Sequence, residues 1–197
     1  MKKSILFIFT VLAITLNSCT DPDDNIIEEV ATDNGKLIVN GVEKKLTKAY
    51  IIPNYTGTNP EYNKRRFYFI LTNGTVTLQD NNFIYSDNTT QLIDFNMFTS
   101  VQNSGSVEFT TYNLLNSFTN VDAINPFIDH SGINTNLVIQ NGQFVSGNTL
   151  DSDDMTAGQV KINQTNGVYS ITFSFGNDDN AITGSYTGAM NVLNYQY

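Results

Sequence analysis

Strict alternation of apolar and polar residues is the feature that most constrains how this chain can fold. In the clearest case, every second residue from Tyr169 to Phe175 is apolar, and the residues between them are Ser or Thr. Successive side chains of a β-strand point to opposite faces, so this segment predicts a half-buried antiparallel strand. No stretch keeps the 3.6-residue period of a helix for three turns. The pattern therefore favours a fold built of strands.

Turn signals place neighbouring strands on both sides of this segment. Asn166-Gly167 is the kind of residue pair that two-residue hairpins favour, and it follows alternating residues at 160–163. A polar loop at 177–180 leads to a further alternating segment, 182–190. Residues 158–190 are thus predicted to form a three-stranded antiparallel meander.

The same reasoning predicts strands across the rest of the chain. Their expected ranges are 36–40, 42–52, 66–72, 75–78, 92–98, 107–112, 137–140 and 144–145. Asn40-Gly41 and Asn141-Gly142 would close hairpins between neighbouring strands. Both faces of 66–72 carry apolar side chains, which predicts a central strand. A short helix is the alternative for 112–118 or 120–127.

About nine or ten strands without crossover helices predict an all-β protein. An antiparallel β-sandwich is the first choice, and a calycin-like β-barrel is the alternative. Gly184 and Gly188, inside a predicted strand, suit a barrel corner as well as a sandwich. Residues 35–197, about 160 in number, are enough for a single β-rich domain with a buried core.

The N-terminus has the order of an export signal, because Lys2 and Lys3 precede an apolar run over 4–16. This run of about 13 residues is too short to span a bilayer core, which needs roughly 20 helical residues. Leu16-Asn17-Ser18-Cys19 resembles the lipobox of bacterial lipoproteins. The resemblance implies that residues 1–18 are a lipoprotein signal peptide and that Cys19 carries fatty-acyl chains such as palmitate. An ordinary signal cleaved elsewhere, with Cys19 left as a free thiol, is the alternative.

The segment 19–34 is acidic and is expected to be a flexible tether. Its acidic run resembles the surface-export signal of Bacteroidetes lipoproteins, which implies an outer-membrane protein displayed on the cell surface; a periplasm-facing protein is the alternative. Gly-x-Leu-x-Val-Asn-Gly at 35–41 and Ile-Thr-Gly-x-Tyr-x-Gly at 182–188 resemble motifs of small uncharacterised β-rich lipoproteins of the same group. That resemblance implies a class and a location, and no activity.

The charge balance argues against nucleic acid as a partner. The formal net charge is −9, and removal of Lys2 and Lys3 with the signal would lower it to −11. Phosphate binding needs clustered Lys and Arg. The nearest such cluster, Lys64-Arg65-Arg66, is interpreted as solvent-facing strand and loop residues. Expected partners are the membrane, through acylated Cys19, and an unknown extracellular ligand or envelope protein.

Catalytic chemistry is short of the residues it needs. His130 is the only histidine, and Asp129-His130-Ser131-Gly132 is interpreted as a polar loop without the nucleophile elbow of a hydrolase. Zinc sites need several His or Cys ligands. For a glycosidase-type acid pair, the acids in or near strands are Glu61, Asp94 and Glu108, of which Asp94 and Glu108 are expected to be exposed. We therefore expect no enzyme and no cofactor, with a hydrolase as the remote alternative.

Oxygen ligands for calcium occur in two acidic loops, which hold Asp151, Asp153 and Asp154 in one case and residues 178–180 in the other. The first loop has Met155 where a third ligand belongs and lacks the glycine and terminal glutamate of the helix-loop-helix motif. These carboxylates are interpreted as solvated turn residues, and no metal site is predicted.

The most suggestive binding segment is the loop 53–63, where Tyr55, Asn59 and Tyr62 combine amphipathic rings with an adaptable amide. An ordinary long hairpin connection is the alternative. We expect a non-catalytic binding or interaction module for a glycan, a peptide or a partner protein. A lipocalin-like carrier of a small apolar ligand is the second hypothesis, and a structural component of an outer-membrane complex is the third.

Overall fold

Strands dominate the computed structural model, which describes residues 33–53, 64–100, 106–115, 125–177 and 179–195. The strands are β1 (Asn34–Val39), β2 (Val42–Leu46), β3 (Lys48–Pro53), β4 (Arg66–Thr72), β5 (Val76–Gln79), β6 (Asn82–Tyr85), β7 (Gln91–Phe98), β8 (Thr111–Leu114), β9 (Phe127–Gln140), β10 (Gln143–Asp151), β11 (Ala157–Thr165), β12 (Val168–Gly176), β13 (Ala181–Gly188) and β14 (Asn191–Val192). The helical element in this part of the chain is one 3₁₀ turn, η2 (Ser152–Asp154). The all-β prediction is therefore confirmed.

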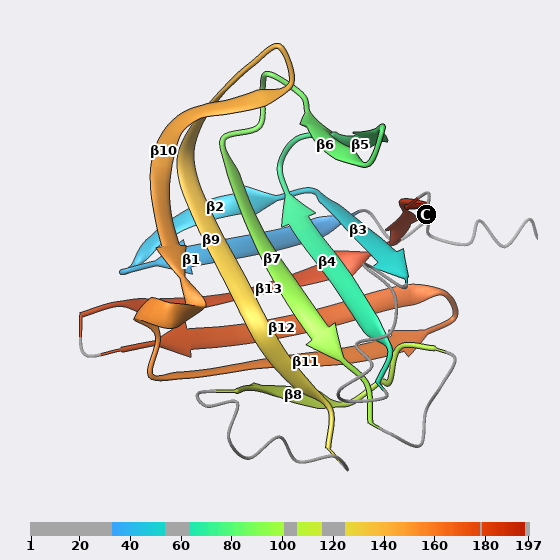
Figure 1. The fold of residues 1–197 in the computed structure, drawn as a ribbon. Helices are drawn as coiled ribbons and strands as arrows, with labels where there is room; N and C mark the ends of the chain where they lie inside the picture. The colour runs from blue at the N-terminus through green and yellow to red at the C-terminus, as the bar shows by residue number, and fades with distance from the viewer. Residues whose placement is uncertain (1–32, 54–63, 101–105, 116–124, 178, 196–197) are drawn as a thin grey trace, which may run out of the picture. The chain divides into compact units, whose positions relative to one another are not determined.

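Twelve strands form one curled sheet, in the order β14-β3-β4-β7-β9-β8-β11-β12-β13-β1-β2, with β10 beside β9. The pairings β14–β3 and β8–β9 are parallel and the others are antiparallel, so the sheet is mixed. Figure 1 shows the sheet folded over itself as a half-barrel, with β4, β7 and β9 crossing in front of β11, β12 and β13.

Apolar side chains fill the space between the two halves of the curled sheet. Phe95 on β7 lies 5.5 Å from Phe173 and 5.9 Å from Phe175 on β12, measured between ring centroids. These rings belong to one cluster of buried side chains that β1, β4, β9, β11 and β13 also supply. Each fully buried side chain of this size stabilises the fold by about 1.5–3 kcal/mol.

The predicted meander and turns are confirmed. β11, β12 and β13 pair in antiparallel register from Ala157 to Gly188. Asn166 and Gly167 both have positive φ, 50° and 80°, as a two-residue hairpin turn requires. The pairs at Asn40-Gly41 and Asn141-Gly142 have the same conformation. β4 pairs with β3 on one side and β7 on the other, as expected of a central strand.

Several boundaries differ from the prediction. The expected strand 42–52 is two strands that break at Thr47, and the strand expected at 107–112 forms at 111–114. β9 and β10 are much longer than predicted, because backbone hydrogen bonds to neighbouring strands hold polar segments that look like loops in the sequence. Residues 112–114 and 127 lie in strands and not in the alternative helices, while 116–124 lie outside the described residues.

The β5–β6 hairpin covers part of the outer face of the sheet, the side away from the main core. The backbone N–H of Val76 donates to the Tyr50 hydroxyl at 3.1 Å, and the Phe83 ring stacks 5.6 Å from that of Tyr68. Tyr85 N–H donates to the Gly142 carbonyl at 3.0 Å, which joins this hairpin to the tip of the β9–β10 hairpin. A second, smaller apolar cluster therefore forms on the outer face.

Candidate functional site

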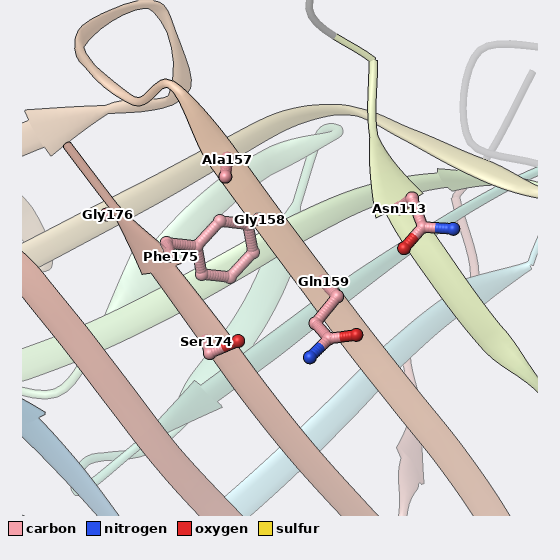
Figure 2. A pocket seen from close by; sticks show the side chains of 7 residues that line it. All are labelled: Asn113, Ala157, Gly158, Gln159, Ser174, Phe175 and Gly176. Atoms are coloured by element: carbon pink, nitrogen blue, oxygen red, sulfur yellow. The ribbon is translucent and has the colours of Figure 1, made fainter.

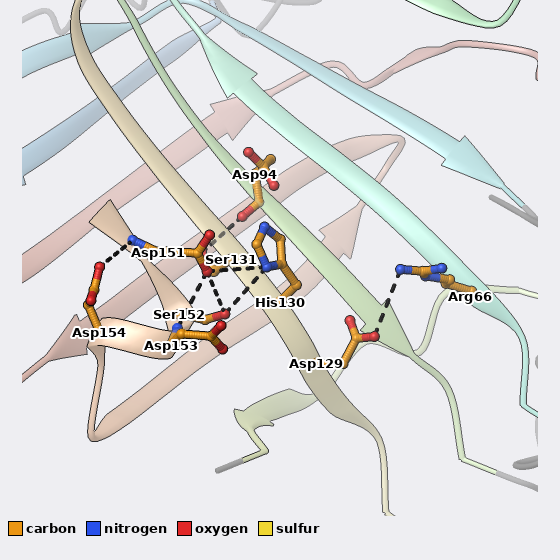
Figure 3. A network of polar contacts seen from close by, with 9 residues as sticks. All are labelled: Arg66, Asp94, Asp129, His130, Ser131, Asp151, Ser152, Asp153 and Asp154. Atoms are coloured by element: carbon orange, nitrogen blue, oxygen red, sulfur yellow. Dashed lines mark hydrogen bonds and ion pairs between the residues drawn. The ribbon is translucent and has the colours of Figure 1, made fainter. Parts of the chain in front are cut away.

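A row of side chains on the outer face of the sheet runs across β7, β9 and β10. Asp94 on β7 lies opposite Gly132 on β9, and Gly132 lies opposite Asp151 on β10. Residues directly opposite on neighbouring strands share a face. Figure 3 shows this polar region, with the His130 ring beside Asp151 and Ser152 and Asp129 turned toward Arg66.

Asp94 is buried, which corrects the expectation that it is exposed. Its side chain is 6% exposed, because all eight residues of β7 are buried and neither face of that strand meets solvent. Gly132 leaves the room that this carboxyl group occupies: a Cβ at Gly132 would lie 2.8 Å from Asp94 Oδ2. Alternation marks which residues share a face, but it does not show that the second face is covered.

Burial leaves the Asp94 carboxyl group with fewer hydrogen-bond partners than its two oxygens can accept. Its Oδ1 atom has no hydrogen-bond partner among the described residues. Removal from water raises the pKa of Asp94 from 3.8 to about 6, and the nearby Asp151 carboxylate adds to the rise. The charge of His130 and hydrogen bonds from the Tyr68 side chain and the Gly132 backbone oppose it. At neutral pH this site therefore holds a largely ionised carboxylate that lacks full compensation.

His130 lies within strand β9, which corrects its assignment to a loop. Its Nδ1 atom is 3.4 Å from Asp151 Oδ1 and 3.5 Å from Ser152 Oγ, and its side chain is 42% exposed. Asp151 also caps the η2 turn, where its side chain accepts from the Asp153 backbone N–H. These contacts fix Asp151 at the rim of the polar row, and none of them forms a nucleophile–base pair with a third orienting group.

The basic segment before β4 is partly buried, which corrects its interpretation as solvent-facing. Lys64 is 1% exposed; its ammonium group donates to the Asn125 carbonyl at 2.7 Å and lies 4.8 Å from the Phe127 ring centroid. The Arg66 guanidinium lies 3.8 Å from Asp129 Oδ2 and also hydrogen-bonds to Asn96. Burial raises the pKa of Asp129, and Arg66 opposes that rise. Both cations thus have structural partners.

A cavity of about 190 Å³ opens beside Asp94. Its other lining residues are Tyr85, Leu92, Asn134, Leu137, Ile139 and Phe144. We refer to this cavity as the Asp94 pocket. Tyr85 comes from the β5–β6 hairpin and Phe144 from the β9–β10 hairpin, so the pocket depends on the contact between these two hairpins, which the Tyr85 N–H···Gly142 hydrogen bond holds together. Thr149 donates to Asn134 Oδ1 at 2.9 Å, which holds the Asn134 amide in one orientation.

A larger depression, about 400 Å³, lies along β8, β11 and β12 (Figure 2). Its side chains include Asn113, Gln159 and Ser174, with Phe175 beneath them. The residues that line it carry no ionisable group, and in the described part of the chain the buried polar side-chain atoms without a partner belong to Asp94 and Asp129. The Asp94 pocket is therefore the better defined candidate site.

The residues singled out from the sequence for lipidation and loop binding, Cys19, Tyr55, Asn59 and Tyr62, lie outside the described residues. These assignments stay predictions. Asp153 and Asp154 lie in the η2 turn, and no group of three His, Cys, Asp or Glu side chains in the described ranges could hold a metal ion. Within the same ranges no helix is long and apolar enough to cross a membrane.

The acids considered for a hydrolytic pair do not form one cluster. Glu61 lies outside the described residues. Glu108 accepts hydrogen bonds from the Ser100 backbone N–H at 2.8 Å and from its hydroxyl at 2.7 Å, whereas Asp94 lies in the outer-face row with Asp151.

Sequence reasoning missed Tyr85 and Phe144 as pocket walls. The alternation of Phe83 and Tyr85 could have predicted β6, but not what it covers.

Comparison with models of known protein families found no match for the chain, and neither curated protein sequences nor solved structures matched it. The class that the fold defines is an all-β protein with a curled mixed sheet.

Proposed function

We propose that the chain is a lipid-anchored protein of the cell envelope whose β domain binds a small ligand without transforming it. The observation that carries this proposal is the Asp94 pocket, which sets a buried carboxyl group without full compensation against apolar walls. Small-molecule sites combine largely apolar walls with a few placed polar groups in the same way. The anchor part of the proposal stands on the resemblance of residues 16–19 to a lipobox.

The pocket supports binding better than it supports a carrier with a central cavity. Buried side chains of the main core fill the space inside the curled sheet, whereas the Asp94 pocket lies on the outer face. Phe144, a lining residue that is 51% exposed, would meet a ligand that extends beyond the pocket. A glycan, a peptide or a partner protein could each supply such a group.

A ligand screen with a blocked variant tests the proposal. Thermal unfolding of the wild type would be measured with glycans, peptides and small molecules, beside Asn134→Phe, which places a ring in the pocket. A ligand at 100 times its Kd stabilises the folded state by about 2.7 kcal/mol, roughly 5–10 °C for a domain of this size. We expect hits whose shift disappears in Asn134→Phe. A screen in which every hit stabilises both proteins equally would refute the pocket as the binding site.

A further inference from the structure

The chemistry of the Asp94 pocket selects for positive charge. In the described residues the ion pairs join Lys36 to Glu43, Arg66 to Asp129 and His130 to Asp151, and they leave Asp94 without a cation within 4.0 Å. Asp151 places a second carboxylate in the same row, one strand beyond Gly132. An anion that enters the pocket would be repelled by both carboxylates, whereas a cation would supply the missing partner of Asp94.

The walls select for an apolar body. Leu92, Leu137 and Ile139 contribute aliphatic surface, and Tyr85 and Phe144 contribute rings from opposite hairpins. Aromatic rings attract ammonium groups as well as hydrocarbon. Apart from the Asp94 carboxyl group and the Tyr85 hydroxyl, the polar side chain in the lining is the Asn134 amide, whose Oδ1 already accepts from Thr149. A sugar ring, whose several hydroxyl groups each need a partner, would leave most of them unmatched here.

We propose that the Asp94 pocket binds a small organic cation, with a primary ammonium group against the Asp94 carboxylate and an apolar body of about one ring between Tyr85 and Phe144. The inference rests on the proposed function, because it names the ligand class of the same pocket. Size agrees: about 190 Å³ holds roughly six water molecules at liquid density, which is room for a single-ring amine.

The carboxylate can present an oxygen to such a ligand by rotating about its terminal bond, which exchanges its hydrogen bonds from Tyr68 and Gly132 for one from the ammonium group. Oδ1 is buried without a partner, and Oδ2 faces the space left by Gly132. Rotation about the terminal bond of an Asp side chain is soft and roughly two-fold, so either oxygen can turn toward the pocket. The acidic net charge of the chain, −9, also favours the approach of cations over anions.

The test compares two probes of nearly the same shape, benzylammonium and benzyl alcohol, on the full chain. Each probe is titrated while the backbone amide resonances of Gly132, Asn134 and Leu137 are followed by NMR. We expect benzylammonium to bind at least tenfold more tightly than benzyl alcohol. Asp94→Asn should weaken benzylammonium at least tenfold and leave benzyl alcohol within twofold. Glu43→Gln removes one charge from an exposed residue of β2 and should change neither affinity.

The outcomes separate the ligand class from the pocket itself. Equal affinities for the two probes, or full retention of benzylammonium binding in Asp94→Asn, would overturn the cation assignment while leaving a binding pocket in place. Failure of both probes to move any of the three resonances would overturn the cation assignment and count against the pocket of the proposed function as well. The comparison of probes on the wild type needs no substitution, so it holds even where a variant folds poorly.

Discussion

Asp94→Asn should make the unliganded protein more stable at neutral pH, and the gain should fade as the pH is lowered. Burial raises the folded-state pKa of Asp94 from 3.8 to about 6. Between these values the folded protein holds a proton that the unfolded chain releases, so proton binding stabilises the fold at pH 4 and stops doing so above pH 6. Each pKa unit is worth about 1.4 kcal/mol, so a difference of roughly 2 units between the folded and unfolded states corresponds to about 3 kcal/mol of unfolding free energy.

The assay is urea unfolding of wild type and Asp94→Asn from pH 4 to pH 7, followed by far-UV circular dichroism and by tyrosine fluorescence, since the chain has ten Tyr and no Trp. Relative to Asp94→Asn, the wild type should lose about 2 kcal/mol of unfolding free energy between pH 4 and pH 7, because the remainder of the total of about 3 kcal/mol is gained only below pH 4. The comparison cancels the titration of the groups that do not interact with Asp94, because these are present in both proteins.

Two controls sharpen the result. Glu43→Gln, at an exposed position, should run parallel to the wild type across the pH range. The charge of His130 lowers the Asp94 pKa, so His130→Gln should move the Asp94 transition to higher pH. A constant difference between wild type and Asp94→Asn over the whole range would refute the reasoning, since it would mean that Asp94 titrates alike in the folded and unfolded states.

Three further predictions concern the anchor, the core and the contact between Gly132 and Asp94. Cys19→Ser should abolish incorporation of radiolabelled fatty acid while Ser18→Ala keeps it, and label retained in Cys19→Ser would contradict acylation there. Tyr186→Phe should destabilise the fold by about 1 kcal/mol in urea, because the buried hydroxyl donates to the Ala189 carbonyl at 2.9 Å; an unchanged midpoint would show that this bond is replaced by water. Gly132→Ala should cost about 1–3 kcal/mol, because its Cβ would lie 2.8 Å from Asp94 Oδ2, and the loss should shrink when Asp94 is also changed to Ala.

Local sequence signals predicted much of the fold. Alternation at 169–175 and 66–72 identified β12 and β4, and the Asn-Gly pairs identified three hairpin turns, because strand periodicity and positive φ are properties of a few consecutive residues. The boundaries of β9 and β10 could not be read in this way. His130 lies in a strand because Asn96 on β7, far away in the chain, is its backbone partner.

The sequence by itself determined the all-β class, the meander of β11 to β13 and the absence of a second histidine or cysteine that limits the chemistry. Only the tertiary structure decided that Asp94 is buried, that Gly132 makes room for it, and that Tyr85 and Phe144 meet beside it. The physical reason is the reach of the interactions involved. Alternation and turn conformation act between neighbours in the chain, whereas the surroundings of Asp94 come from residues far from it in the sequence, such as Tyr68 on β4 and Gly132 on β9.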